Sequence, residues 1–492
     1  MAGVMELPKG FPLRYESFIG GRLHRSSQNE RIDVLSPING KNLYDIPQAG
    51  QVEIGEAMNC AEKSFKKWSL CSVTTRANIL DKIADIIKRN VKLLAQIEVY
   101  DTGKLFSNAI NEIDLASQYF KYFAACIVTQ EGSVAQVEDV LSFNLYESLG
   151  RVGIILPWNF PLLMFCWKVA PALAAGNVVI VKPSEFASLS ILKLMELITP
   201  IIPKGIINVL LGCGVSTGMQ MLEHDGFDKF SFTGGVETGK KVMKAVSNHL
   251  TPVSLELGGK SPCVVTADVM RHGEQFLDRL IQTITSFTYN QGQICGNLSR
   301  LLIDCSIADF ILEKIKLKLS QFSIGDPRVQ INMMGPVISQ ERHNFITQKI
   351  SEAKASGAII TSFDNSFNLS KDCEQGYYLS PYLVEGNHSM EIFQEEIFGP
   401  VLCIDTFKTL EEAVVLSNCT QYGLTASIWS RDIKEINYLA KNIVAGKIWV
   451  NTSHIYYPHT KFGGMKKSGH ANDMHKLALN EYQKIKNIIQ YY

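Results

Sequence analysis

Cys295 lies in a stretch whose residue types suit nucleophilic chemistry. Residues 287–300 read FTYNQGQICGNLSR, so small or amide-bearing residues flank the cysteine on both sides. Such residues let the backbone approach a reacting atom closely and leave N–H groups free to point at it. A free cysteine is more often an inert, buried apolar residue, so this stretch alone leaves both interpretations open.

The cysteine is expected in a loop between two rigid elements. Phe276, Leu280 and Ile284 recur at helical spacing within residues 271–285, and residues 300–304 have the composition of a strand. Catalytic residues are commonly found on loops that a rigid scaffold positions.

Two further polar residues are of types that suit acyl chemistry. Asn159 lies between the prolines of PWNFP (157–161), where its amide could donate to an oxyanion or could simply belong to a turn. Glu256 ends the apolar run 253–257, and burial there would raise its pKa toward the range of a general base. A capped-turn glutamate remains the alternative.

Other short runs suit a dinucleotide. Lys182 and Glu185 in KPSE could bind ribose hydroxyls or could be a solvated surface pair. Residues 212–218, GCGVSTG, have GxGxxxG spacing and are a weak signal. Residues 232–239, FTGGVETG, are a better candidate because they join a strand to a helix whose N-terminus could carry a pyrophosphate. In EEIFGP (395–400), a carboxylate and an aromatic ring could contact a second ribose and a flat ring, or form an ordinary turn.

Composition excludes several classes of protein. Lys plus Arg number 48, as do Asp plus Glu, so nothing indicates binding to nucleic acid or a membrane surface. The 11 cysteines form no CxxC pair and no zinc-ligand cluster, which predicts a reduced protein without a metal site. Residues 1–16 lack the features of a secretory signal, and the most apolar stretch, 152–169, is interrupted by prolines and a lysine. We therefore expect a cytoplasmic protein.

The sequence predicts an α/β fold. Two or three domains are expected, because 492 residues are too many for one simple core. From 151 to 257, strands and helices alternate, which predicts a doubly wound parallel sheet with ligands beyond the carboxyl ends of its strands. Helices are expected at 52–69, 74–102, 108–125, 215–224, 308–320, 340–355, 410–417 and 433–442. A hairpin or arm is expected at 134–149, and a second α/β domain has strands near 299–304, 401–406, 425–430 and 447–450.

Taken together, the motifs PWNFP, KPSE, FTGG-E-GK, LELGGK, NQGQ-C, EEIFGP and FGG-K-SG follow one another in an order that resembles the NAD(P)-dependent aldehyde dehydrogenases. The resemblance covers essentially the whole chain. It implies a Rossmann-like NAD-binding domain (1–126 and 149–258), a catalytic domain (259–450), and a small β oligomerisation arm with a tail (127–148 and 466–492).

The resemblance also implies a role for each catalytic residue. Cys295 would attack the aldehyde to form a thiohemiacetal, with the amide of Asn159 and the Cys295 backbone N–H holding the oxyanion. Hydride transfer to the nicotinamide would leave a thioester, and Glu256 would activate the water that hydrolyses it.

The resemblance implies NAD as the cofactor, because Glu185 would repel the 2′-phosphate of NADP. Lys182 and Glu185 match contacts to the adenosine ribose, Gly235 matches a contact to the pyrophosphate, and Glu396 with Phe398 matches a nicotinamide-ribose clamp. The full expected set is Lys182, Ser184, Glu185, Gly212, Gly218, Phe232, Thr233, Gly234, Gly235, Gly258, Glu396 and Phe398.

Within the family, FTGGVETGK and residues 449–457 look most like bacterial betaine-aldehyde dehydrogenases, which enclose a trimethylammonium group in aromatic faces. Asp114 would add negative charge near the channel mouth. Aromatic funnels also serve uncharged aldehydes, so an aminoaldehyde or an aliphatic aldehyde is the alternative. The expected substrate pocket comprises Phe160, Trp167, Tyr289, Ile294 and Tyr456.

Three departures from the family pattern remove no catalytic group, and one of them is the interval of 39 positions from Glu256 to Cys295, which is a few residues longer than usual. Residues 469–473 read GHAND where a Gly-Arg-Glu run is usual, and Lys461 replaces a common proline or tryptophan. A non-catalytic binding protein on this fold is the rival interpretation. We expect a homodimer or homotetramer in which the arm and the tail exchange contacts.

Overall fold

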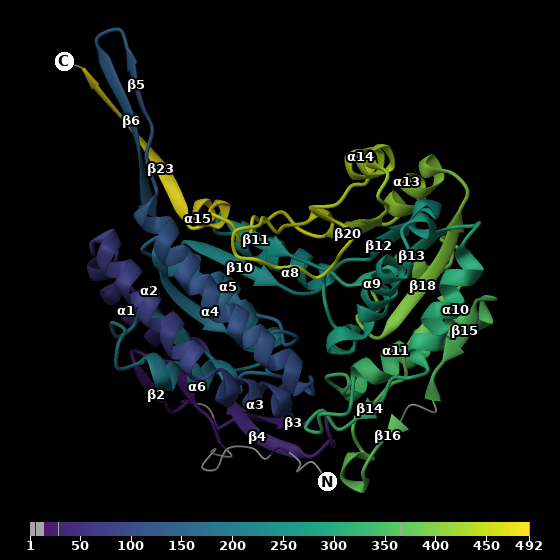
Figure 1. The fold of residues 1–492 in the computed structure, drawn as a ribbon. Coiled ribbons are helices and arrows are strands. Elements are labelled where there is room, and N and C mark those ends of the chain that lie inside the picture. The colour runs from purple at the N-terminus through teal and green to yellow at the C-terminus, as the bar shows by residue number, and fades with distance from the viewer. Residues whose placement is uncertain (1–4, 6–13, 28, 365–366, 492) are drawn as a thin grey trace.

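The computed structural model describes residues 5, 14–27, 29–364 and 367–491. It contains two seven-stranded sheets and a three-stranded sheet, with helices packed around the two larger sheets (Figure 1). This arrangement confirms the predicted α/β fold class. Most of residues 1–16, on which the absence of a secretory signal was argued, lie outside the described chain.

The first large sheet has the order β11-β10-β7-β8-β9-β1-β2, and the four connections that join β7, β8, β9, β10 and β11 are those of a doubly wound sheet. The chain runs outward from β7 to β9 and then returns to the other side of β7 with β10. The carboxyl ends of β7 and β10 therefore form a topological switch point, where ligands bind. The strands are β1 (Ser17–Ile19), β2 (Arg22–His24), β7 (Arg151–Ile155), β8 (Val178–Lys182), β9 (Ile207–Val209), β10 (Lys229–Thr233) and β11 (Val253–Glu256).

Helices cover this sheet because their apolar faces match its buried strands. The helices are α1 (Gln51–Trp68), α2 (Val73–Arg89), α3 (Val91–Thr102), α4 (Phe106–Val128), α5 (Pro161–Ala174), α6 (Leu189–Ile198), α7 (Met219–Glu223) and α8 (Val236–Ser247). Helix α5 is buried along its whole length. It is apolar on all sides apart from one lysine, as expected for a helix enclosed by other elements.

Two predicted helices differ from the structure. The helix expected at 74–102 is broken at Asn90, whose backbone (φ −108°, ψ 16°) leaves the helical region. Its side-chain amide donates to the Ile86 carbonyl at 2.8 Å, in keeping with the tendency of asparagine to compete with helical hydrogen bonds. The helix expected at 215–224 starts as a π-helical turn, Gly214–Gly218, before α7.

The second large sheet has the order β15-β17-β18-β13-β12-β20-β21. Its strands are β12 (Ser261–Val265), β13 (Leu298–Asp304), β15 (Ile359–Ser362), β17 (Tyr382–Glu385), β18 (Val401–Phe407), β20 (Thr425–Trp429) and β21 (Lys447–Val450). The helices are α9 (Glu274–Thr285), α10 (Ala308–Leu319), α11 (Gln340–Ala355), α12 (Glu391–Gln394), α13 (Leu410–Asn418), α14 (Ile433–Asn442) and α15 (Leu477–Asn480), the last of which lies in the C-terminal segment. Sequence patterns predicted β13, β18, β20 and β21 but not β12, β15 or β17.

The third sheet projects from the body of the molecule (Figure 1). It consists of β5 (Val134–Val137), β6 (Val140–Ser148) and β23 (Gln483–Tyr491), in which the C-terminal strand pairs antiparallel with β6 over its whole length. The predicted hairpin is confirmed. Short two-stranded sheets are formed by β3 (Arg31–Leu35) with β4 (Asn42–Pro47), β14 (Ile324–Gly325) with β16 (Phe367–Asn368), and β19 (Tyr422–Gly423) with β22 (Met465–Lys466).

Across the described ranges, none of the helices combines the length and apolar character needed to span a bilayer.

Candidate active site

The loop between α9 and β13 carries Cys295 in a strained, well-anchored backbone. Asn290 and Gln291 have left-handed conformations (φ 48° and 56°), which non-glycine residues adopt only when the surrounding structure holds them. The Asn290 amide donates to the backbone carbonyl of Asn159 at 3.0 Å. Gly292 has φ +74°, and a Cβ there would overlap the carbonyl oxygen of Gly399. Each of these features fixes the approach of the chain to Cys295.

Cys295 lies where two cavities meet. A larger cavity of about 430 Å³ and a smaller one of about 240 Å³ share Phe160, Met164, Thr233 and Cys295 in their walls. The shared region follows the carboxyl ends of β7 and β10, which is the switch point of the first sheet. A reactant in either cavity can therefore reach the same thiol.

Glu256 is an isolated carboxylate in the wall of the larger cavity. It ends β11 and is only 3% exposed. Within the described chain, neither carboxylate oxygen has a hydrogen-bond partner. Burial, and next the negative charge of Asp473, hold the pKa of Glu256 well above its ordinary value. The sequence predicted that burial would raise the pKa of Glu256, and the environment of this carboxyl agrees with that direction.

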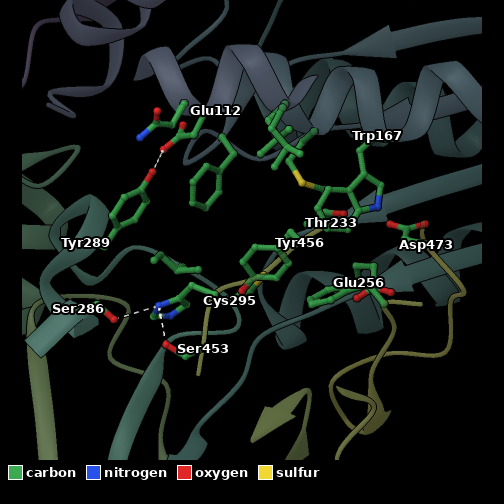
Figure 2. A pocket seen from close by; sticks show the side chains of 18 of the residues that line it. Glu112, Trp167, Thr233, Glu256, Ser286, Tyr289, Cys295, Ser453, Tyr456 and Asp473 are labelled. Atoms are coloured by element: carbon green, nitrogen blue, oxygen red, sulfur yellow. Dashed lines mark hydrogen bonds between the residues drawn. The ribbon is translucent and has the colours of Figure 1, made fainter. Parts of the chain in front are cut away.

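A buried ion pair beside Glu256 was missed from the sequence. Lys168 on α5 donates to Asp473 at 2.8 Å, with both side chains almost fully buried. Asp473 lines the larger cavity together with Glu256, and Figure 2 shows both carboxylates on one side of Cys295. The signal in the sequence was a lone lysine in an otherwise apolar helix, which requires a buried partner.

Two of the departures from the family pattern lie close to Glu256. Gly469, with φ +122°, forms an antiparallel bridge with Glu256, and a Cβ there would overlap the Leu255 carbonyl. Lys461 lowers the pKa of Glu256 through its charge, opposing the effect of burial. The atypical run 469–473 therefore packs directly against the end of β11 that carries Glu256.

The Cys295 thiol is protonated at neutral pH in this state. Desolvation, with smaller contributions from Glu256 and Glu396, raises the pKa of Cys295 to about 12. Asn159, in the wall of the smaller cavity, donates from its side-chain amide to the Gln293 carbonyl at 2.8 Å. Because an amide has two N–H groups, one remains for another acceptor.

The smaller cavity combines a carboxylate, aromatic rings and a helix N-terminus. Glu396 accepts from the Gly259 N–H at 3.0 Å, and burial raises its pKa to about 7. The rings of Phe398 and Trp158 meet edge to face, with centroids 5.4 Å apart. Gly234 and Gly235 lead from β10 into α8, whose N-cap, Gly235, supplies no capping side chain. Phe232 lies beneath this turn and does not line either cavity.

Three residues of the predicted cofactor set, Lys182, Ser184 and Glu185, form a separate group at the end of β8. The Lys182 ammonium lies 3.2 Å from the Glu185 carboxylate, which also accepts from the Gly214 N–H at 3.3 Å. Although burial opposes ionisation, Lys182 holds the pKa of Glu185 below its ordinary value. Ser184 accepts from the Phe186 N–H at 3.3 Å.

The two predicted glycines of the 212–218 run differ in their surroundings. Gly212 has φ +146°, and a Cβ there would overlap the Thr217 hydroxyl, so this position requires glycine. Gly218 lies next to Lys182, with space for a Cβ 3.7 Å from the lysine Cδ. Gly258, in contrast, lines the smaller cavity, and a Cβ there would overlap the Glu396 carboxylate.

All the predicted substrate-pocket residues line the larger cavity: Phe160, Trp167, Tyr289, Ile294 and Tyr456. Several rings are already in contact with groups of the protein. Trp167 stacks on Tyr119 with centroids 5.3 Å apart. Lys104 lies 4.9 Å from the Phe160 centroid, and Lys447 lies 5.7 Å from that of Tyr456.

On α4, the acidic residue that lines this cavity is Glu112, whereas the sequence had suggested Asp114 near the channel mouth. Asp114 forms an ion pair with Lys88 of α2 and does not line the cavity. Glu112 lines it and accepts from the Tyr289 hydroxyl at 3.1 Å (Figure 2). The phase of α4 explains the difference, because residues two positions apart on a helix face different directions. Burial raises the pKa of Glu112 to about 7.

His454 adds a neutral polar group to the same wall. Its Nδ1 lies 3.1 Å from the Ser286 hydroxyl and 3.3 Å from that of Ser453. Burial lowers the pKa of His454 to about 4, so the ring carries no charge at neutral pH.

Comparisons with known proteins agree on one family. Residues 24–488 match the sequence model of the aldehyde dehydrogenase family. A long-chain-aldehyde dehydrogenase from Acinetobacter sp is 40% identical over 98% of this chain and 96% of its own length. An acetaldehyde dehydrogenase from Pseudomonas aeruginosa is 38% identical over 98% of this chain and 96% of its own length.

Solved structures give the same result. The betaine aldehyde dehydrogenase of Staphylococcus aureus, in complex with NAD+, superposes with a TM-score of 0.92 at 33% identity and covers 97% of this chain and 95% of its own. The chain belongs to the aldehyde dehydrogenase family, a family of NAD(P)-dependent oxidoreductases, and the resemblance drawn from its motifs is confirmed. The relatives carry names for different aldehydes, so they do not agree on a substrate.

Proposed function

We propose that the protein oxidises an aldehyde to its carboxylic acid with NAD, through a thioester on Cys295. The observation that carries this proposal is the position of the thiol, which borders two cavities at once. A substrate in the larger cavity and a nicotinamide in the smaller one would meet at Cys295. Covalent capture divides the oxidation and the hydrolysis into two easier steps.

The residues of the smaller cavity fit a dinucleotide. The Thr233 hydroxyl is buried there without a hydrogen-bond partner in the described chain, and the Cα of Gly235 faces open space. Glu396 would accept from a ribose hydroxyl, and the N-terminus of α8 would hold the pyrophosphate. Lys182 and Glu185 would bind the adenosine ribose, and the Glu185 charge supports NAD over NADP. When bound, NAD supplies the hydride acceptor.

The chain's own groups would carry the proton and charge transfers. The Cys295 thiol, whose pKa desolvation raises to about 12, would pass its proton to water as it attacks the aldehyde. The second N–H of the Asn159 amide and the Cys295 backbone N–H would stabilise the oxyanion. After hydride transfer, Glu256 would deprotonate the water that hydrolyses the thioester.

An uncharged aldehyde is the substrate that the larger cavity supports best. Leu115, Leu163, Met164, Ile294 and Phe462 give its wall an aliphatic and aromatic character. The Lys447 ammonium lies 5.7 Å from the centroid of the Tyr456 ring, where it would repel a second cation, whereas Lys104 beside Phe160 is paired with Glu98 and Glu112.

Betaine aldehyde is the second candidate. The aromatic rings of Trp167 and Tyr289 and the carboxylate of Glu112 support it, because they could contact a trimethylammonium group. Formation of NADH from acetaldehyde, longer aliphatic aldehydes, aminobutyraldehyde and betaine aldehyde distinguishes the candidates. Faster turnover of aliphatic aldehydes than of betaine aldehyde supports the first candidate, and the reverse supports the second. Absence of NADH with every aldehyde would refute the proposed function.

We also propose the predicted division of labour among domains. The first sheet, with residues 1–126 and 149–258, would bind NAD, and residues 259–450 would supply Cys295. The arm (127–148) and tail (466–492) would join subunits into a homodimer or homotetramer. Exposed apolar side chains on β5, β6 and β23 support this role. All 11 cysteines are free, which supports a reducing compartment such as the cytoplasm.

A further inference from the structure

Arg342 lines the smaller cavity, although none of the sequence motifs pointed to it. It lies in the first turn of α11, where the Ser339 hydroxyl accepts from its backbone N–H at 3.2 Å. It shares the cavity wall with Gly234, Gly235 and Glu396. A cationic side chain therefore faces the cavity that the N-terminus of α8 also borders.

The Arg342 guanidinium is held in place but is incompletely satisfied. It lies over the Phe345 ring, 4.5 Å from the centroid, and donates from Nη2 to the Ile397 carbonyl. In the described chain, its buried Nε has no hydrogen-bond partner. A guanidinium has five N–H donors in a planar fork, so most of them remain available to a ligand.

Within the described chain, the Arg342 guanidinium also has no carboxylate at ion-pair distance, because its side-chain hydrogen bond goes to the Ile397 carbonyl and its Nε has no partner. Glu396 is near enough to influence it, and burial lowers the pKa of Arg342 while Glu396 opposes that effect. A cation that is enclosed without a paired anion is costly unless a ligand supplies the negative charge. The fork geometry of arginine suits phosphate oxygens in particular.

We propose that Arg342 binds the pyrophosphate of the dinucleotide, in the cavity that the N-terminus of α8 also lines. This inference rests on the proposed use of a nicotinamide dinucleotide. Arg342 would hold the diphosphate from a side chain of the second domain, whereas the helix would hold it through backbone N–H groups of the first. Because Lys182 and Glu185 lie outside this cavity, Arg342 would contribute equally to NAD and NADP.

The test is equilibrium binding of NADH, measured by the fluorescence of the bound nucleotide, to the wild type and to Arg342→Gln. We expect the Kd for NADH to rise about tenfold, as for the loss of a charge-assisted hydrogen bond. The Kd for ADP should rise similarly, and that for adenosine, which has no phosphate, should stay unchanged. Added salt should weaken NADH binding more steeply in the wild type than in the variant.

Lys354→Gln is the matched control, because Lys354 is an exposed cation on the same helix. It should leave all three Kd values unchanged. Arg342→Lys should retain part of the NADH affinity at low salt, which a purely structural role would not predict. An unchanged Kd for NADH in Arg342→Gln, or an equal loss of NADH and adenosine binding, would overturn the proposal. Failure of the wild type to bind NADH would instead refute the proposed function.

Discussion

At the scale of single residues, one physical effect acts on both reacting groups. Burial raises the pKa of the Cys295 thiol to about 12 and that of the Glu256 carboxyl well above its ordinary value. Burial therefore favours the protonated form of each group, and Glu256 must lose its proton before it can act as a general base. Lys168, Asp473 and Lys461 adjust this balance through their charges.

The Lys168–Asp473 pair should set the pH dependence of the reaction. A base must be deprotonated to act, so the rate rises with pH through the pKa of Glu256. Asp473 raises that pKa, so Asp473→Asn should move the acidic limb of the kcat profile to lower pH. Lys168→Met should move it in the opposite direction.

Thermal unfolding of each variant is the necessary control, because removal of one member of a buried ion pair costs about 3–5 kcal/mol. The double variant should be more stable than either single variant. If the variants are folded and the acidic limb of their kcat profile stays at the wild-type pH, the electrostatic account is contradicted.

Glu112 should influence substrate choice, and Asp114 should not. Glu112→Gln removes the negative charge from the cavity wall, so the KM for betaine aldehyde should rise more than that for acetaldehyde, by a factor of about three to ten. Asp114→Asn is the matched control on the same helix and should leave both KM values unchanged. Equal changes in the two KM values for Glu112→Gln would show that its charge does not reach the substrate.

At the scale of elements, the loop before Cys295 illustrates what sequence can and cannot predict. The helix before it and the strand after it follow from apolar periodicity, and both are present as α9 and β13. The left-handed backbone of Asn290 and Gln291 has no periodic signal, because long-range contacts to Asn159 and Gly103 hold it. The break at Asn90 was also missed, because the segments on either side of it both keep apolar residues at helical spacing and the sequence pattern gives no sign of an interruption.

Gly292→Ala tests how strongly this loop depends on close packing. The new Cβ would overlap the Gly399 carbonyl at a positive φ, so both strain and a clash result. We expect at least a hundredfold loss of kcat/KM and a lower melting temperature. Gly357→Ala is the matched control, because Gly357 has φ +93° with open space around it and should lose only about 1 kcal/mol of stability. Similar effects of the two substitutions would argue against a packing requirement at Gly292.

At the scale of the whole molecule, the site is assembled from segments far apart in the sequence. Ligands bind beyond the carboxyl ends of parallel strands, so the sequence could predict that the motifs ending β7, β8, β10 and β11 lie at the site. Lys168, Glu112 and Arg342 escaped prediction, because their helices carry ordinary amphipathic or apolar patterns and only the tertiary fold brings them to the cavities.

The projecting three-stranded sheet should mediate oligomerisation. Ile485 and Ile489 on β23 are 62% and 68% exposed, which is unusual for isoleucine unless a partner covers it. The double substitution Ile485→Lys/Ile489→Lys should shift the mass measured by light scattering toward that of a monomer, while NADH binding persists. A wild-type protein that is already monomeric would contradict the proposed role of the arm.

The central claim is that Cys295 carries a thioester that Glu256 helps to hydrolyse, and Glu256→Gln tests it most directly. After rapid mixing with NAD and a turned-over aldehyde, the variant should form one equivalent of NADH per subunit in a burst and then nearly stop. Intact mass spectrometry should show one acyl group added, and peptide mapping should assign it to Cys295. Steady turnover without an adduct, or an adduct on another residue, would contradict the account.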